Sequence, residues 1–282
     1  MSLRTYFQVS GADSSRLAEQ VAAQRAQVRE RLRSVRRVVA VMSGKGGVGK
    51  SFVTASLARA AVRRWPDGVG VLDADLRSPT VARLLGAAGP LRVTEAGVSP
   101  AMGADGVRVM STEFLLDAGR PLAWREPDTE RFVWRGTLEA GVLREFLGDV
   151  VWGELELLLV DLPPGADGVA DLAALVPGLT GALAVTIPSD EARRSVGRAL
   201  RAAAEAGIRL LGVIENMAGY HCADCGRTGP LFTGDAGADL AAEFGVPLLA
   251  RLPFVPGAQA ATGRCDGALD AGTVDRLVEA LA

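Results

Sequence analysis

The residues best suited to chemistry lie in one glycine-rich octet, Gly44-Lys45-Gly46-Gly47-Val48-Gly49-Lys50-Ser51. The octet fits G-x-x-x-x-G-K-[ST], a pattern whose backbone N–H groups cradle phosphates, with a lysine on the terminal phosphates and a hydroxyl on Mg²⁺. Its inner glycines allow backbone dihedrals and a close approach that side chains would obstruct. We therefore predict that Lys50 bridges the β- and γ-phosphates of a bound nucleotide and that Ser51 holds Mg²⁺.

The use of lysine singles out the same octet. The chain has two lysines, Lys45 and Lys50, and the other 29 of its 31 basic residues are arginine. A lysine ammonium is a compact point charge on a flexible stem, which suits phosphate oxygens. Lys45 directly follows the first glycine and is an addition to the ordinary pattern, so it indicates a particular branch of phosphate-binding loops.

Three aspartates follow apolar runs that read as strands. Asp73 and Asp75 lie in Val71-Leu72-Asp73-Ala74-Asp75, and Asp161 precedes Pro163-Pro164-Gly165. Taken alone, such residues would more often be helix caps. Beside a phosphate loop, however, the carboxyl end of a parallel strand faces the ligand crevice. We expect Asp161 to bind Mg²⁺ through water and Asp75 to orient the attacking water.

Two cysteines form a Cys222-x-x-Cys225 pair, whereas Cys265 has no neighbouring ligand and is expected to be a small buried side chain. Two thiolates can share a metal site but cannot fill it, since zinc and cubane clusters usually take four protein ligands. A symmetric dimer would supply the missing pair. The residues leave three possibilities open: a bridging [4Fe–4S] cluster, a zinc site with or without His221, and redox or structural thiols.

Alternating strands and helices must position these groups. Short apolar runs predict strands at 38–42, 69–72, 107–110, 157–160, 182–186, 210–214 and 248–252. Helical patterns at 52–65, 195–206 and 236–244 separate some of them. This order predicts an α/β fold, a doubly wound and mainly parallel sheet with helices on both faces.

The amino-terminal part is set apart as an arginine-rich extension. Residues 13–36 read as an amphipathic helix with an apolar face made of Leu17, Val21, Val28, Leu32 and Val35. Such a helix either docks on the main domain or serves as an arm for a partner or nucleic acid. We divide the chain into an extension, 1–36, and a P-loop NTPase domain, 37–282, that carries the cysteine segment 222–225.

The composition argues against nucleic-acid-coating, membrane and secreted proteins. Hydrophobic residues make up 49% and charged residues 23%, with a net charge of −2, which argues against a protein that coats nucleic acid. No apolar run approaches the roughly 20 residues that span a bilayer, so no membrane partner is expected. The first residues, MSLRTYFQVSGADSS, lack the apolar core of a signal peptide, which favours a cytoplasmic location.

The octet with its second lysine resembles the deviant phosphate loops of MinD, ParA, nitrogenase iron protein and arsenite ATPase. That resemblance implies a homodimer in which Lys45 reaches the nucleotide of the opposing subunit. Over about residues 37–270 the chain is similar to the Mrp/ApbC family of iron–sulfur cluster carrier ATPases. The segments that carry the resemblance are 42–51, Asp73-Ala74-Asp75 with Pro79, Trp134-Arg135-Gly136, 152–155, 161–165, Glu215-Asn216-Met217, and Cys222 with Cys225 followed by Gly226.

The resemblance implies ATP and Mg²⁺ as cofactors and a [4Fe–4S] cluster that passes from donor proteins to recipient apoproteins. It also implies that Asn216 contacts the adenine ring, with Pro253 nearby. The chain departs from the family at Ala166-Asp167-Gly168, where Thr-Gly-Asp is usual, and at Arg77 and Ser78, where an aromatic residue and a glycine are usual. The first departure lies in a switch region and bears on the rate of hydrolysis.

Two other functions compete with the carrier. A positioning or partition ATPase of the MinD or ParA kind would act on membrane or DNA, but it leaves the cysteine pair unexplained, and the carboxyl-terminal segment has one basic residue, Arg276. A bacterial tyrosine kinase is suggested by 73–79, but such kinases phosphorylate a tyrosine-rich tail and this chain has only Tyr6 and Tyr220.

Overall fold

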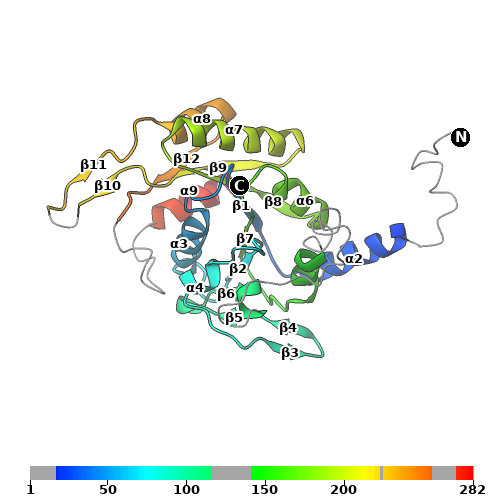
Figure 1. Ribbon diagram of the computed structural model, residues 1–282. Helices are drawn as coiled ribbons and strands as arrows, with labels where there is room; N and C mark the ends of the chain where they lie inside the picture. The colour runs from blue at the N-terminus through cyan, green and yellow to red at the C-terminus, as the bar shows by residue number, and fades with distance from the viewer. Residues whose placement is uncertain (1–16, 116–140, 223–224, 256–270, 282) are drawn as a thin grey trace, which may run out of the picture.

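The protein is described by a computed structural model that covers residues 17–115, 141–222, 225–255 and 271–281. Its centre is an eight-stranded sheet in the order β12-β9-β8-β1-β7-β2-β6-β5 (Figure 1). Every neighbouring pair of strands in this sheet is parallel except β5 and β6. Helices cover both faces, so the predicted fold class is confirmed.

Seven strands of this sheet match the predicted apolar runs closely, and β5 at its edge was not predicted. In sheet order they are β12 (Leu248–Arg251), β9 (Leu210–Glu215), β8 (Leu179–Thr186), β1 (Val38–Met42), β7 (Leu157–Asp161), β2 (Val69–Asp73), β6 (Arg108–Met110) and β5 (Ala101–Met102). The largest difference is in β8, which begins at Leu179 rather than at Ala182. Two short hairpins were not predicted: β3 (Arg92–Thr94) with β4 (Gly97–Ser99), and β10 (Tyr220–His221) with β11 (Thr228–Gly229).

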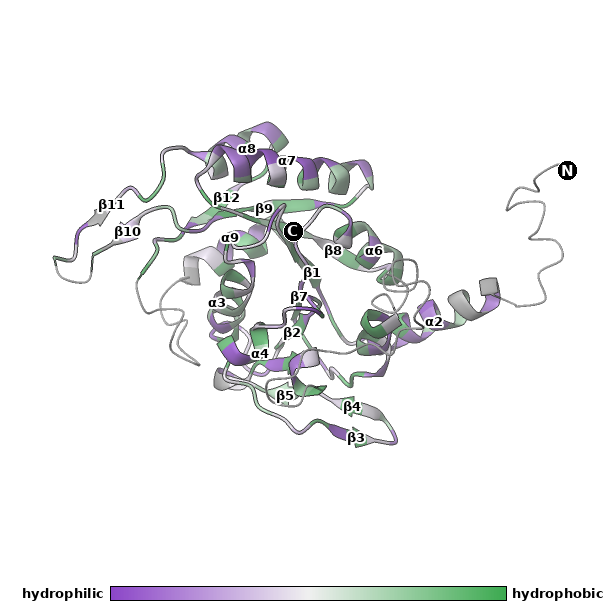
Figure 2. Ribbon diagram, in the orientation of Figure 1, coloured by the Kyte–Doolittle hydropathy of each residue, from purple (hydrophilic) through white to green (hydrophobic). Residues whose placement is uncertain are grey.

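Side chains alternate along each central strand, and both faces are buried. In β1, Val38, Ala40 and Met42 enter one apolar core while Val39 and Val41 enter the other. Figure 2 shows the hydrophobic colouring along β8 and β9. This continuous burial is typical of parallel strands between two helical layers.

Each face of the sheet has its own set of helices. The face that contains Val39 is covered by α3 (Lys50–Val62), α4 (Val81–Leu84) and α9 (Ala271–Leu281). The face that contains Val38 is covered by α2 (Leu17–Arg31), α6 (Gly168–Leu175), α7 (Asp190–Glu205) and α8 (Ala236–Phe244). Single turns of 3-10 helix are η2 (Ala104–Gly106) and η3 (Thr112–Leu115), and residues 141–149 are also helical.

The predicted helix at 13–36 is shorter in the structure. Helix α2 ends at Arg31, because the next residues pair with the segment before β7: Arg36 N donates to Leu155 O, and Leu155 N donates to Ser34 O. Val28, Leu32 and Val35 are buried in the main core, so this part of the segment is docked on the domain. Residues 1–16 and the side chains of Leu17 and Val21 lie outside the described part, and the division at residue 36 stays a prediction.

The carboxyl ends of the parallel strands bring distant residues to one edge. Asp73 at the end of β2 pairs in register with Asp161 at the end of β7, and Thr186 at the end of β8 pairs with Glu215 at the end of β9. The glycine loop follows β1, and the segment leading to the cysteines follows β9. This edge is therefore where a ligand crevice is expected.

The central strands should dominate the stability of the fold. Leu159 in β7 has no exposed surface, so Leu159→Ala should lower the free energy of unfolding by about 2–5 kcal/mol through lost burial and a cavity. Urea denaturation measures the change. Val93→Ala, at a side chain that is 79% exposed, is the control and should change stability by less than about 0.5 kcal/mol. Equal effects of the two substitutions would contradict this description of the core.

Candidate functional site

The glycine loop turns tightly around a cavity at the carboxyl edge of the sheet. Gly47 and Gly49 have φ angles of 81° and 80°, a conformation that residues with a Cβ rarely adopt. A Cβ on Gly44 would lie 2.2 Å from the carbonyl carbon of Ser195, and the Ser195 hydroxyl donates to Gly44 O at 2.7 Å. Helix α7 therefore fixes the first glycine of the loop, and the third and fourth glycines supply its curvature.

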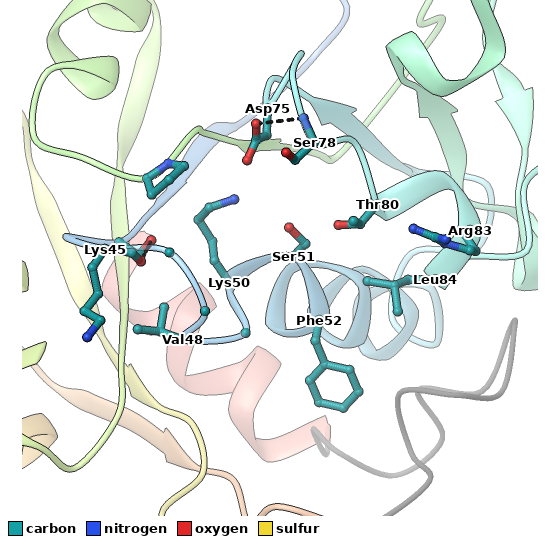
Figure 3. A pocket seen from close by; sticks show the side chains of 15 residues that line it. Lys45, Val48, Lys50, Ser51, Phe52, Asp75, Ser78, Thr80, Arg83 and Leu84 are labelled. Atoms are coloured by element: carbon teal, nitrogen blue, oxygen red, sulfur yellow. Dashed lines mark hydrogen bonds between the residues drawn. The ribbon is translucent and has the colours of Figure 1, made fainter. Parts of the chain in front are cut away.

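Helix α3 begins directly after the loop, at Lys50. Its N-cap is Gly49, which has no side chain to accept a hydrogen bond from the first-turn N–H groups. Those N–H groups and the helix dipole together favour an anion at this end. The loop and the start of α3 line a cavity of about 570 Å³ together with residues of the β2–α4 connection (Figure 3). A cradle of backbone donors around such a cavity suits a phosphate chain.

A buried ion pair lies beneath the loop. The Lys50 ammonium is 2.7 Å from the Asp161 carboxylate, and the two side chains are 6% and 0% exposed. Ser51 Oγ donates to the same carboxylate oxygen at 2.6 Å, and the Thr54 hydroxyl lies 2.6 Å from the other oxygen. The structure thus brings Lys50, Ser51 and Asp161 together as the sequence predicted. Thr54 was missed, although it lies one helical turn after Lys50.

This donor set fits a magnesium ion. A hydroxyl and a carboxylate from adjacent elements are the hard oxygen ligands that Mg²⁺ takes, with water and phosphate oxygens completing its shell. Ser51 and Asp161 are the residues that would hold the ion. Ser51 lines the cavity, and Asp161 lies beneath it within hydrogen-bond distance of the Ser51 hydroxyl.

The two aspartates after β2 differ in burial. Asp75 is half-buried, lines the cavity, and accepts a hydrogen bond from Ser78 N at 3.3 Å (Figure 3). Desolvation raises the pKa of its carboxyl group, against an opposing effect of Lys50. Asp73 is fully buried beneath it and accepts from the backbone N–H groups of Thr80 and Val81 at 3.0 and 3.1 Å. Asp73 therefore fixes the loop that carries Asp75.

Lys45 does not join the other site residues. In Figure 3 its side chain leads away from Lys50, although its backbone lines the same cavity. Its ammonium lies 3.0 Å from the carboxylate of Glu191 at the start of α7, in a pair whose side chains are 36% and 80% exposed. Within one chain, Lys45 is thus at the surface beside the cavity.

The far end of the cavity contains residues that the sequence analysis did not identify as site residues. Ser78, Thr80, Arg83 and Leu84, all from the β2–α4 region, face the start of α3 near Phe52 (Figure 3). No motif marks these positions, because their approach to the glycine loop depends on how α4 packs against α3. The departure from the family pattern at Ser78 therefore lies in the wall of the cavity.

Asn216 and Pro253 have different positions from the loop residues. Asn216 is 3% exposed, and its amide Nδ2 donates to Val48 O at 2.9 Å, so it supports the loop from below. Neither it nor the exposed Pro253 is among the residues that line the cavity. The contact of these two residues with adenine stays a prediction.

The cysteine pair lies in the turn of the β10–β11 hairpin, which extends away from the body of the molecule (Figure 1). Cys222 N donates to Arg227 O at 3.0 Å and Gly226 N donates to Cys222 O at 2.9 Å, which closes the turn. Cys222 is partly buried and Cys225 is exposed. Within the described residues, no group of three or more His, Cys, Asp or Glu side chains could hold a metal ion. In the described part of one chain, the hairpin thus presents two thiols and no further ligand group beside them.

Comparison with known proteins decides the family. A family model named ParA, described as "NUBPL iron-transfer P-loop NTPase", matches residues 34–276. The chain belongs to this family. The resemblance to iron–sulfur carrier ATPases is confirmed at that level, as is the assignment to nucleotide-binding P-loop NTPases.

The names of individual relatives are consistent with this family. The chain is 37% identical to an "Iron-sulfur cluster carrier protein" of Saccharolobus solfataricus, over 86% of this chain and 80% of the relative. It is 38% identical to the human "Cytosolic Fe-S cluster assembly factor NUBP2", over 80% and 82%. A nucleotide-binding protein of Archaeoglobus fulgidus, solved in complex with ADP, has a TM-score of 0.65 and 31% identity and covers 91% of each chain. The cell division ATPase MinD of Pyrococcus furiosus, at a TM-score of 0.55 and 22% identity, shares the fold, covering 88% of this chain and 100% of MinD.

None of the helices in the described parts of the chain combines the length and the apolar character that crossing a membrane requires.

The buried Asp73 gives the site a testable pH dependence. Desolvation, followed by repulsion from Asp161, raises the pKa of Asp73 from 3.8 to about 7. The folded protein then holds a proton that the unfolded chain loses, so this group's contribution to stability is full below pH 3.8 and is lost as the pH rises through about 7. The free energy of unfolding of the nucleotide-free protein, relative to Asp73→Asn, should fall between pH 5 and pH 8. Urea denaturation across this range measures the difference, and a constant or rising difference would contradict the assignment.

Proposed function

We propose that this protein is an ATP-hydrolysing iron–sulfur cluster carrier that works as a homodimer, accepts a [4Fe–4S] cluster from a donor protein and passes it to recipient apoproteins. The observation that supports this best is that a phosphate cradle and a two-thiol hairpin both leave the carboxyl edge of one sheet. The names of the relatives support the cargo, and the ADP-bound relative supports the nucleotide. The human relative, named a cytosolic factor, supports a cytoplasmic location.

The nucleotide half of the proposal uses the loop and the buried pair. The N–H groups at the start of α3 bind phosphate oxygens, and Lys50 exchanges part of its contact with Asp161 for the β- and γ-phosphates. Ser51, and Asp161 through water, would hold Mg²⁺, which would neutralise charge on the phosphates. Asp75 accepts a hydrogen bond from the attacking water and so orients it toward the γ-phosphate. The raised pKa of Asp75 makes its carboxylate a better acceptor than an ordinary surface aspartate.

Lys45 completes the site of a second copy. Its ion pair with Glu191 is exposed, and exposed ion pairs contribute little to stability. The Lys45 ammonium can therefore leave Glu191 at little cost and contact a phosphate across a subunit interface. A cation supplied in this way acts as an arginine finger does. Hydrolysis then depends on dimerisation, because the Lys45 side chain is directed away from Lys50 in its own subunit and acts on the nucleotide of the partner.

The cargo half uses the hairpin. A [4Fe–4S] cluster takes four thiolates, and one chain offers Cys222 and Cys225 in its turn. Two copies related by a two-fold axis supply four, and the exposed position of Cys225 leaves the cluster open to exchange with another protein. This arrangement uses the cysteine pair, which a positioning ATPase would leave without a role.

Replacing one cysteine should abolish iron binding without affecting nucleotide binding. Anaerobically reconstituted protein should bind about four iron atoms per dimer. Cys222→Ser should lose most of this iron and keep its affinity for ATP, because the hairpin lies outside the cavity. Iron and zinc analysis, the visible spectrum and a fluorescent-nucleotide titration measure these properties. Cys265→Ser is the matched control and should keep its iron; equal iron in all three proteins, or zinc in place of iron, would refute the cluster assignment.

Lys45 should affect hydrolysis and leave binding largely intact. Lys45→Ala removes the cation offered to the partner, so we expect turnover to fall by about 10³-fold or more, as for a lost arginine finger. Nucleotide affinity of the single subunit should change by less than about tenfold. The control is Arg63→Ala, at an exposed residue after α3. Turnover of Lys45→Ala at the level of this control would exclude Lys45 from the reaction.

A further inference from the structure

We propose that Asn216 is a positioning residue that couples the phosphate loop to the cysteine hairpin, so that bound nucleotide changes the reactivity of Cys222 and Cys225. The inference rests on the proposed function in one respect, that a nucleotide occupies the cavity above the loop. It does not depend on what the cysteines carry.

The first link is the contact between Asn216 and the loop. Its buried amide donates to Val48 O, and a Cβ on Gly49 would lie only 2.2 Å from the same Nδ2 atom. The absence of a side chain at Gly49 is therefore what allows the amide to fit. When phosphates draw the loop N–H groups into a fixed arrangement, Val48 O and the Asn216 amide must move or be held with them.

The second link is the short connection from Asn216 to the thiols. Met217 is one of three residues other than glycine with positive φ among those described, at 55°. An L-residue in this conformation is held there by its surroundings and can relax when they change. Ala218 N then donates to Leu252 O, and Phe254 N donates to Gly219 O. The next residues are Tyr220 and His221 of β10, and Cys222 follows directly.

The third link is a fixed point just before Asn216. Glu215 is 1% exposed, accepts a hydrogen bond from Gly237 N at 2.7 Å and lies 3.3 Å from Arg251 Nε. The end of β9 is thus tied to both α8 and β12. These buried contacts hold the end of β9 in the sheet, whereas the partly exposed Met217 and the hairpin after it are where a displacement of Asn216 is expected to be taken up.

A matched contact on the other side of the loop provides the control. Ser195 also donates a side-chain hydrogen bond to a loop carbonyl, Gly44 O, at 2.7 Å. It belongs to α7, which leads to β9 and not directly to the cysteines. Ser195→Ala and Asn216→Ala therefore each remove one support of the loop, and only the second removes the link to the hairpin.

The experiment measures alkylation of thiols by iodoacetamide in reduced, cluster-free full-length protein, with and without saturating MgADP. Mass spectrometry of peptides separates Cys222 and Cys225 from Cys265, and protein is kept at a concentration where native mass spectrometry shows single subunits. We expect MgADP to lower the rate at Cys222 and Cys225 by about fivefold or more in wild type and in Ser195→Ala. In Asn216→Ala, saturated with MgADP as checked by fluorescent-nucleotide titration, the change should be less than about twofold.

Three results would overturn the proposal: no nucleotide effect in wild type, a full effect in Asn216→Ala, or loss of the effect in Ser195→Ala as well. Hydrogen exchange of the wild-type protein is a second test that needs no variant to fold. MgADP should slow exchange in 216–222 along with the loop, and unchanged exchange in 216–222 would also overturn it. A failure of iron binding would refute the carrier function and leave this result standing, whereas normal iron binding without a thiol response would refute the coupling alone.

Discussion

The arrangement of the site depends on one buried ion pair, between Lys50 and Asp161. Both side chains are almost fully removed from water, and a buried charge is strongly unfavourable unless an opposite charge and hydrogen bonds satisfy it. The pairing of β1 with β7 supplies this match, since Val41 at the end of β1 lies beside Asp161. Ser51 and Thr54, both on α3, occupy the remaining positions around the carboxylate. The order of the central strands thus fixes where the helix begins, and the helix fixes the loop.

The segment that carries the cysteine pair leaves the same edge of the sheet as the phosphate loop. The phosphate loop follows β1, the strand at the centre, while the cysteine hairpin follows β9, two strands away in the sheet. Asn216 bridges this separation because it directly follows β9 and its amide donates to Val48 O. The hydrogen bond from Asn216 to Val48 therefore joins the phosphate loop to the segment that leads to the cysteines, while Cys225 stays exposed.

Much of the fold could be predicted because the strands of a doubly covered sheet are continuous apolar runs that a single sequence displays. Leu157–Val160 and Val38–Met42 are examples. The start of β8 was missed because Leu179, Thr180 and Gly181 do not form such a run, and the exposed two- and three-residue strands carry no periodic signal. Lys50, Ser51 and Asp161 could be placed together because their roles follow from a motif and from strand ends. Thr54 shares the face of Lys50 at a spacing of one turn and could have been found. The pairing of Lys45 with Glu191 and of Asn216 with Val48 joins residues far apart in the chain, which no local pattern reports.

The proposed function requires that two copies of this chain share one cluster while each binds its own nucleotide. Native mass spectrometry of the anaerobically reconstituted protein tests it most directly, because it weighs chains, iron and sulfide in the same particle. We expect a species of two chains with four iron and four sulfide, which returns to single chains when a chelator removes the cluster. Iron carried by single chains, or two-chain particles that contain no iron under any loading condition, would contradict it.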